Sequence, residues 1–392
     1  MPLLILADDL TGAADCAARC RRAGMAITIS MRPPTPPLPS GAVALTSDSR
    51  HLPAAVAARR VAELVAGLRE LADITWYKKI DSTLRGNIGS ELDAMLDTLE
   101  RPCAVICPSF PAQNRGLRAG YLSSPLPLAR PAHLPTLLAQ QSRRRVAAIP
   151  LADVEAGAER LADRLAAAYA QAAQLLVVDA MTDQDLRTIL TAVAHALPDA
   201  LLCGSAGLIG ALSLGRSVAE PRHIDGEELV QPGGAALLVV GSGSATAHRQ
   251  IAYLRQHSGI DTIEIDLAAG APDEERRTER DVLLHLPEPS PQVALDGPTA
   301  RACAAQLAEA ALPIIAGSRP ALLALVGGDT ALQVLNRLGI ERLTVLRELL
   351  PGIPLTAGID AAGERRFVIV KAGNHGDDAT LADLLRHARN EE

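Results

Sequence analysis

The sequence predicts an α/β protein with two domains, each built on a mainly parallel sheet flanked by helices. Its 392 residues are many for a single hydrophobic core. Short apolar runs alternate with helical patterns, which is typical of parallel strands joined by helices. Around residues 215–234 this alternation fades into prolines, adjacent glycines and charges. We therefore expect a first domain at residues 1–214, a linker at 215–234 and a second domain at 235–392.

The first half contains one apolar run after another, each followed by a polar turn. Apolar runs predict buried strands, and apolar residues at helical spacing predict helices. The expected strands are residues 3–7, 25–31, 42–46, 74–77, 103–107, 146–149 and 175–179. The expected helices are residues 13–22, which Gly24 closes, then 53–70, 88–99 and a segment after Asp153.

The second half repeats the alternation after the linker. The expected strands are residues 236–240, 322–326 and 367–370, and the expected helices are 246–256, 331–338 and a closing helix after Asp377. Residues 270–280 are polar and read as a surface loop. The sequence contains no tandem repeat.

The composition limits the partners of the protein. Aromatic residues make up 2% of the chain, too few for a platform that stacks single-stranded nucleic acid. The formal net charge is -7, with no long basic block, which disfavours nucleic acid and anionic membranes as partners. The apolar amino terminus has no basic flank and runs into Asp8 and Asp9, unlike a signal peptide or a membrane span. We expect a cytoplasmic protein, and the sequence leaves open whether it forms a homo-oligomer.

The six cysteines do not have the spacing of a metal site. Cys16 and Cys20 are four residues apart, as are Cys103 and Cys107, whereas zinc sites usually place two residues between paired cysteines. No histidine accompanies either pair. We interpret these cysteines as small apolar core residues.

Residues 78–87 combine more chemistry than any other short stretch. They lie between the strand at 74–77 and the helix at 88–99, where open α/β sheets place ligands. Arg85 can grip a carboxylate or phosphate with two hydrogen bonds, and Asp81 can orient or deprotonate a hydroxyl. Gly86 would let the backbone approach a ligand closely. The alternative is a solvated turn whose serine or threonine caps the following helix.

Three glycine-bearing turns, at residues 241–244, 327–330 and 373–376, each follow an expected strand in the second half. Backbone amides exposed at the start of a helix suit phosphate, and three such turns in one domain favour a nucleotide site. The pattern of a P-loop is absent. Turn 241–244 begins like a dinucleotide fingerprint, but Thr246 stands where the third glycine belongs. Asp261 and Asp266 lie at a suitable spacing for a ribose, so a dehydrogenase stays open as an alternative.

The chain resembles the four-carbon acid sugar kinases over nearly its whole length. The resemblance rests on Ala-Asp-Asp-Leu-Thr-Gly-Ala at residues 7–13, Lys-Ile-Asp-Ser-Thr-Leu-Arg-Gly-Asn at 79–87, Gly-Gly-Asp-Thr at 327–330, Pro-Gly-Ile-Pro at 351–354 and Lys-Ala-Gly at 371–373. It implies an acid-sugar domain followed by a nucleotide domain, with the active site in the cleft between them. It also implies ATP as the phosphoryl donor, and Mg²⁺ is expected with ATP.

Individual residues match the functional positions of that family. The resemblance implies sugar-acid binding by Asp9, Arg50, Lys79, Ile80, Asp81 and Ser82. It implies ATP binding by Ser242 or Ser244, Gly327, Gly328, Asp329, Thr330 and Gly373. Charge adds Arg85, which with Arg50 and Lys79 would hold the carboxylate, while Asp9 and Asp81 would bond hydroxyls. Either aspartate could be the catalytic base, Asp329 could serve ribose or metal-bound water, and His375 is interpreted as a bystander.

Three classes of function therefore remain in view: a sugar-acid kinase, a dehydrogenase and a non-catalytic binding protein. The resemblance favours a kinase that phosphorylates the terminal hydroxyl of D-threonate or D-erythronate, because the 3-oxo-tetronate kinases tend to carry Ala-Lys in place of Leu84-Arg85. A 3-oxo-tetronate 4-kinase is the nearest alternative. An NAD-dependent dehydrogenase of a small hydroxy acid, and a non-catalytic two-domain protein that closes on a small acid, are more distant ones.

Overall fold

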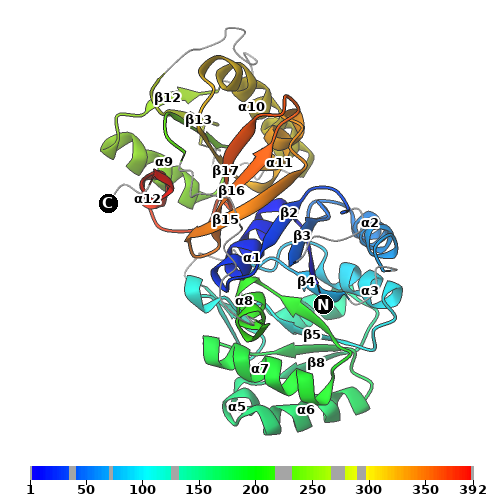
Figure 1. The fold of residues 1–392 in the computed structure, drawn as a ribbon. Coiled ribbons are helices and arrows are strands. Elements are labelled where there is room, and N and C mark those ends of the chain that lie inside the picture. The colour runs from blue at the N-terminus through cyan, green and yellow to red at the C-terminus, as the bar shows by residue number, and fades with distance from the viewer. Residues whose placement is uncertain are drawn as a thin grey trace. The chain divides into compact units, whose positions relative to one another are not determined.

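A computed structural model describes residues 2–34, 41–69, 74–124, 132–216, 232–265, 279–288 and 297–389 (Figure 1). The chain separates into two compact units. The first comprises Met1–Ile27 and Arg32–Pro221, and the second comprises Thr28–Met31 and Arg222–Glu392. Most of the expected linker, at 217–231, and most of the expected surface loop at 270–280 lie outside the described residues.

The first unit contains a parallel sheet in the order β3-β1-β4-β10-β5-β9-β8. Its strands are β1 (Leu3–Ala7), β3 (Ala42–Thr46), β4 (Thr75–Lys79), β5 (Ala104–Cys107), β8 (Val146–Ile149), β9 (Leu175–Val178) and β10 (Leu201–Gly204). Because all of them run the same way, the loops that leave their carboxyl ends meet at one edge of the sheet.

Helices cover both faces of this sheet (Figure 1). On one face, α2 (Ala54–Ala66), α3 (Ile88–Thr98) and α4 (Leu134–Gln141) bury apolar side chains against Leu4, Leu6 and Leu45. A second row of adjacent helices comprises α1 (Leu10–Arg22), α8 (Ala206–Arg216), α7 (Asp183–Ala196) and α6 (Ala158–Ala170). The remaining elements are the short α5 (Leu151–Glu155), a 3₁₀ turn at Pro111–Gln113 and a hairpin of β6 (Gly116–Arg118) and β7 (Tyr121–Ser123).

The second unit has a mixed sheet in the order β12-β13-β11-β14-β17-β16-β15-β2. The parallel strands are β12 (Asp261–Glu264), β13 (Val282–His285), β11 (Ala236–Val240), β14 (Leu322–Val326) and β17 (Arg365–Lys371), and β16 (Ile353–Ile359) and β15 (Arg342–Leu350) run antiparallel to their neighbours. Its helices are α9 (Ala245–His257), α10 (Gly297–Ser318), α11 (Gly328–Arg337) and α12 (Thr380–Arg389).

The strand β2 (Ile27–Ser30) differs from its expected place. It pairs antiparallel with β15, with Ile29 opposite Leu343. Thr28–Met31 therefore belongs to the second unit, although residues 25–31 are expected in a first domain of residues 1–214. Apolar periodicity identifies a strand but says nothing of which sheet receives it.

One element is not expected from the sequence, and one expectation is wrong in detail. The hairpin of β15 and β16, which turns at Pro351 and Gly352, is not expected from the sequence because charges interrupt the alternation of β15. Helix α11 begins at Gly328, so the stretch 327–330 is mostly the first turn of a helix and not a loop before one. Within the described residues, no helix combines the length and apolar character needed to span a membrane.

The largest correction in the stretch 78–87 concerns its two lysines. Strand β4 extends through Lys79, so both lysines are strand residues and both are buried. Lys78 Nζ lies 2.7 Å from Glu91 Oε2 on α3, and Ser49 Oγ donates to the other oxygen of Glu91 at 2.7 Å. Lys78 is thus an internal charge whose partner fixes α3 against the sheet, and it is not a ligand-binding residue in a loop.

Removing one member of this buried pair should strongly destabilise the protein. We expect Glu91→Ala to lower the free energy of unfolding by about 3–5 kcal/mol, because it leaves the ammonium of Lys78 uncompensated. Asp97→Ala on the same helix is the control, because the Asp97 side chain is 47% exposed, its partner Arg143 lies at the surface, and its other partner Arg144 keeps Asp93 as an ion-pair partner. That control should cost less than about 1 kcal/mol. Urea unfolding measures both, and equal losses would contradict this interpretation.

Candidate functional site

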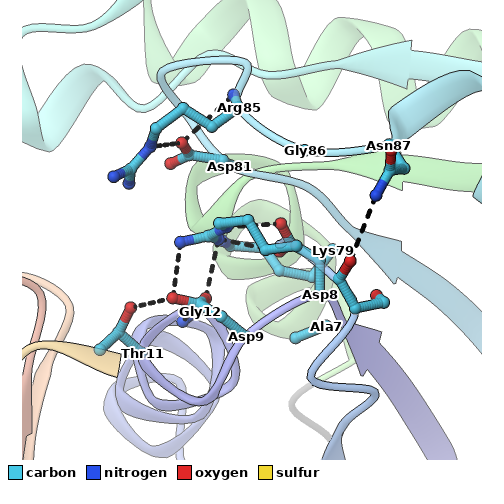
Figure 2. Close-up of polar contacts among 12 residues, drawn as sticks. Ala7, Asp8, Asp9, Thr11, Gly12, Lys79, Asp81, Arg85, Gly86 and Asn87 are labelled. Carbon is cyan, nitrogen blue, oxygen red and sulfur yellow. Dashed lines mark hydrogen bonds and ion pairs between the residues drawn. The ribbon is translucent and has the colours of Figure 1, made fainter. Parts of the chain in front are cut away.

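The loop after β1 places two aspartates at the start of α1 (Figure 2). Asp9 is the N-cap of that helix: Gly12 N donates to its Oδ1 at 2.7 Å, and Thr11 Oγ1 donates to its Oδ2 at 2.6 Å. Gly12 also allows a close approach, because a Cβ there would lie 2.8 Å from both Asp9 Oδ1 and Lys79 Nζ. A helix N-terminus, an aspartate and a buried ammonium therefore meet at this point.

Arg50, in the loop after β3, joins both aspartates. Its Nε and Nη2 donate to the two oxygens of Asp8 at 2.7 and 2.9 Å, and its Nη1 and Nη2 donate to those of Asp9 at 2.6 and 2.8 Å. Burial alone would raise the pKa of Asp8, but Arg50, together with Lys78 and Lys79, outweighs burial and lowers it. Most of the donors of Arg50 therefore already serve the protein, and its role in holding a ligand carboxylate stays a prediction.

Asp81 and Arg85 form the next ion pair, in the turn after β4. Arg85 Nε and Thr83 Oγ1 both donate to Asp81 Oδ2. Burial would raise the pKa of Asp81, but Arg85, followed by Arg50, holds it well below its usual value. Figure 2 shows the end of the Arg85 guanidinium extending past Asp81, and the side chain is 53% exposed. Arg85 thus keeps accessible donors.

The rest of this turn is fixed by its neighbours. Asn87 Nδ2 donates to the carbonyls of Ser49 and Leu52 at 3.2 and 2.8 Å, which ties the turn to the loop after β3 (Figure 2). Asn87 is the residue at the N-cap of α3, and no side chain caps that helix. The alternative in which Ser82 or Thr83 caps this helix is therefore wrong. The Thr83 hydroxyl instead bonds Asp81, and the Ser82 hydroxyl accepts from Arg115.

Beneath these loops lies a buried acid that the sequence reading does not single out. Asp15 on α1 is 7% exposed, and burial raises its pKa to about 8 against the opposing influence of Lys79. Burial disfavours the charge of Lys79, but the surrounding acidic groups raise its pKa, so the ammonium stays charged. Asp15 lies on the buried face of α1. In the sequence it only interrupts the apolar pattern of that helix, and this pattern does not indicate a functional site.

The second unit brings the glycine-bearing turns together. A Cβ on Gly241 would overlap Thr330 Oγ1, and a Cβ on Gly373 would overlap Ser242 Oγ and lie 3.1 Å from Ser244 Oγ. A Cβ on Gly327 would lie 3.5 Å from the backbone nitrogen of Ser242. The expected nucleotide-binding residues of all three turns therefore converge at the carboxyl ends of β11, β14 and β17, and the glycines are what permits this spacing.

Helix α9 holds two of these turns together. Ser244 Oγ accepts from Ala247 N as the cap of α9 and donates to the carbonyl of Gly373 at 2.8 Å. Gln250, farther along the same helix, donates to the carbonyls of His375 and Asp377 at 2.8 and 2.7 Å. Gln250 is fully buried, so it is a positioning residue that polarity alone does not reveal.

Two acidic residues considered for the nucleotide lie in different places. Asp329, in the first turn of α11, is at the glycine turns and has Arg301 Nε 3.7 Å away. Asp261 begins β12, so it lies at the opposite edge of the sheet from the turns, and Asp266 is outside the described residues. Asp261 is therefore badly placed to bind the ribose of a dinucleotide at these turns, which weakens the dehydrogenase alternative.

The cysteines are all buried free thiols. Among the described residues, no cluster of three or more histidine, cysteine, aspartate or glutamate side chains has an arrangement that could hold a metal ion. The chemistry at both carboxyl edges therefore consists of ion pairs, hydroxyls and backbone amides.

Two family models match the two halves of the chain: a sugar-binding N-terminal domain at residues 3–212 and a nucleotide-binding C-terminal domain at residues 237–381. A D-threonate kinase from Cupriavidus necator is 33% identical, with 97% of this chain and 96% of that protein covered. The chain belongs to the four-carbon acid sugar kinase family. A 3-oxo-tetronate kinase from Pseudomonas savastanoi is 30% identical, with coverage of 98% and 97%.

Solved structures agree with the α/β fold of this family member. A Salmonella typhimurium protein superposes with a TM-score of 0.74 at 24% identity, covering 98% of this chain and 99% of its own. A Haemophilus influenzae protein gives a TM-score of 0.68 at 23% identity, with 99% of each chain covered. The predicted family and the predicted two-domain α/β class are confirmed.

The contact between two glycine turns provides a test of the second unit. Gly373→Ala should lower the free energy of unfolding by about 1–3 kcal/mol, because the new methyl group must displace Ser242. Gly259→Ala is the matched control, because no atom lies within 4 Å of a Cβ at that position. Thermal or urea unfolding compares the two, and a neutral Gly373→Ala would show that the turns do not pack as described.

Proposed function

We propose that the protein is an ATP-dependent kinase of a four-carbon sugar acid, which phosphorylates the terminal hydroxyl of D-threonate or D-erythronate. The observation that carries the proposal is the convergence of the three glycine-bearing turns in one unit. The turns pack closely at the carboxyl ends of β11, β14 and β17, and backbone amides of glycine turns at a helix start suit phosphate. Curated relatives named D-threonate kinase and 3-oxo-tetronate kinase support the class of substrate. The Leu84-Arg85 pair favours the former over the latter.

The proposed sugar-acid site is the polar edge of the first unit. We assign it Asp9, Lys79, Ile80, Asp81, Ser82 and Arg85, and we assign Arg50 to holding Asp8 and Asp9 in place. Asp9 and Asp81 are acceptors suited to sugar hydroxyls. Because the pKa of Asp81 is held low, it is a poor proton acceptor and acts mainly by orienting a hydroxyl. Phosphoryl transfer tolerates this, because it depends on positioning and charge neutralisation.

The proposed ATP site consists of Ser242, Ser244, Gly327, Gly328, Asp329, Thr330 and Gly373. Gly241, Gly327 and Gly373 let these turns pack closely, since a Cβ on each would lie against a neighbouring turn, and the helix start at Gly328 suits phosphate. Mg²⁺ would accompany ATP and neutralise its phosphate oxygens. Asp329 is the acidic residue at these turns and fits contact with the metal through water, with Arg301 nearby as a competing cation. A cytoplasmic location and the oligomeric state stay predictions of the sequence.

The direct test is a substrate panel with the purified full-length protein. ADP release from ATP and Mg²⁺ should appear with D-threonate or D-erythronate and should be weaker with 3-oxo-tetronate. A parallel assay with NAD⁺ and the same acids should show no change in absorbance. ADP release that requires 3-oxo-tetronate would move the assignment to that branch of the family. ADP release with none of the acids would refute the proposal.

Asp81→Asn tests the acid-sugar side. We expect kcat at saturating tetronate to fall about 100-fold, because a misdirected hydroxyl reacts far more slowly, while the KM for ATP is kept. Because the pKa of Asp81 in the folded protein lies well below 3.8, the ordinary pKa of an aspartate, its carboxylate stays charged down to strongly acidic pH. Its titration should therefore produce no acid limb in kcat between about pH 5 and 8. Asp199→Asn, at a side chain 79% exposed, is the control.

A further inference from the structure

Helices α10 and α11 pack side by side in the second unit, and ion pairs join them near both ends of α11 (Figure 1). In the first turn of α11, Asp329 Oδ1 lies 3.7 Å from Arg301 Nε on α10. In the last turn of α11, Arg337 Nε donates to Glu309 Oε1 on α10 at 2.6 Å. Of these two pairs, only the first lies at a turn assigned to ATP, so Arg301 brings a cation to that turn.

Helix α10 also contacts the neighbouring glycine turn, at residues 241–244. Its buried Leu307 lies against Gly241, since a Cβ on Gly241 would be 3.0 Å from Leu307 Cδ2. The same Cβ would overlap Thr330 Oγ1, in the first turn of α11. Two of the glycine-bearing turns therefore meet against α10, and Arg301, earlier on that helix, lies beside one of them.

The ion pair between Arg301 and Asp329 is open to solvent. The two side chains are 30% and 24% exposed, so each can contact a ligand without any rearrangement of the core. An ion pair at a partly exposed position is held weakly, because water competes with it. Phosphate oxygens can therefore take over donors of Arg301, and a guanidinium can offer them two parallel hydrogen bonds.

The position of Arg301 suits a second anion. The start of α11 carries the positive end of the helix dipole, which favours an acid such as Asp329 and disfavours a cation. Further negative charge at this point would therefore stabilise Arg301. A phosphate chain at the backbone amide of Gly328 would supply that charge, since helix starts bind phosphate. The amide and the guanidinium thus favour the same ligand.

Two other cations near the turns are placed differently. Lys371, at the end of β17, is buried, and its ammonium donates to the carbonyl of Ala372 at 3.0 Å. Arg249 on α9 pairs with Asp378 at 2.8 Å, in the segment between the third turn and α12. Arg301 combines an accessible guanidinium with a partner in the first turn of α11, so we choose it as the phosphate-binding cation.

We infer that Arg301 binds the terminal phosphates of ATP, and that Asp329 holds its guanidinium beside the start of α11. The inference rests on the proposed kinase function and adds a cation to the ATP site. Backbone amides contribute only partial charges, whereas a guanidinium contributes a full positive charge where phosphoryl transfer concentrates negative charge. Arg301 thus distinguishes a triphosphate from a nucleotide that lacks the terminal phosphates.

The test compares ATP with AMP, which shares its adenosine and first phosphate but lacks the terminal two. Calorimetry with the full-length protein measures the Kd for ATP, and displacement of ATP measures the Kd for AMP. Arg301→Met should raise the Kd for ATP by about tenfold or more, the loss expected for a hydrogen bond between charged groups. The Kd for AMP and the KM for the tetronate should change by less than about threefold, within the range of non-specific effects.

Further variants separate phosphate binding from helix packing. Arg337→Met is the matched control, because it removes the ion pair at the other end of the same two helices, and it should bind ATP as wild type does. Arg301→Lys keeps the charge and should restore part of the lost affinity, since an ammonium attracts phosphate but cannot form the two-bond fork. A purely structural role predicts equal losses in Arg301→Lys and Arg301→Met. Arg301→Gln is a second neutral variant should Arg301→Met not fold.

The outcomes separate the two proposals. A wild-type protein that binds no ATP would refute the kinase function and the role of Arg301 with it. A wild type that binds ATP, with an unchanged Kd in the neutral Arg301 variants, would overturn only the role of Arg301. The same holds if these variants lose affinity for ATP and AMP equally, which would indicate that Arg301 shapes the turns. Weaker ATP binding in Arg249→Met, with Arg301→Met unaffected, would transfer the role to Arg249.

Discussion

The polar edge of the first unit depends on one interaction, the bridging of Asp8 and Asp9 by Arg50. Without it, two adjacent carboxylates would repel each other at the end of β1, and Asp9 would lose part of what holds it as the cap of α1. The same guanidinium lowers the pKa of Asp81 in the next loop. One side chain thus ties together the loops after β1, β3 and β4 and fixes their charges.

Much of the fold follows from sequence because the parallel strands are short apolar runs. Strands such as Val146–Ile149, Ala236–Val240 and Leu322–Val326 have the expected bounds, since turn residues flank a fully apolar core. The β15–β16 hairpin escaped prediction because β15 is only half buried and carries charges among its apolar residues. Local pattern fails where the tertiary environment, and not the residue type, decides burial.

The candidate site was predictable in its residue types but not in its pairings. The motifs at 7–13 and 79–87 identify the aspartates and cations, yet nothing in their spacing shows that Arg50 pairs inward or that Lys78 belongs to Glu91. The two members of each pair are far apart in the sequence, and the order of the strands in the sheet brings them together. Asp15 was missed for the same reason, because a lone polar residue on an apolar helix face carries no local signal of a site.

The placement of β2 has a consequence for how the chain folds during synthesis. β2 leaves the ribosome early, but β15, with which it pairs, is made about 300 residues later. The edge of β2 that pairs with β15 therefore stays unpaired, and open to pairing with other strands, until most of the chain has been translated. Neither unit is a continuous length of chain, so completion of the second sheet is coupled to both ends of the gene product. A fragment that stops at the linker would leave the edge of β2 that pairs with β15 without its partner.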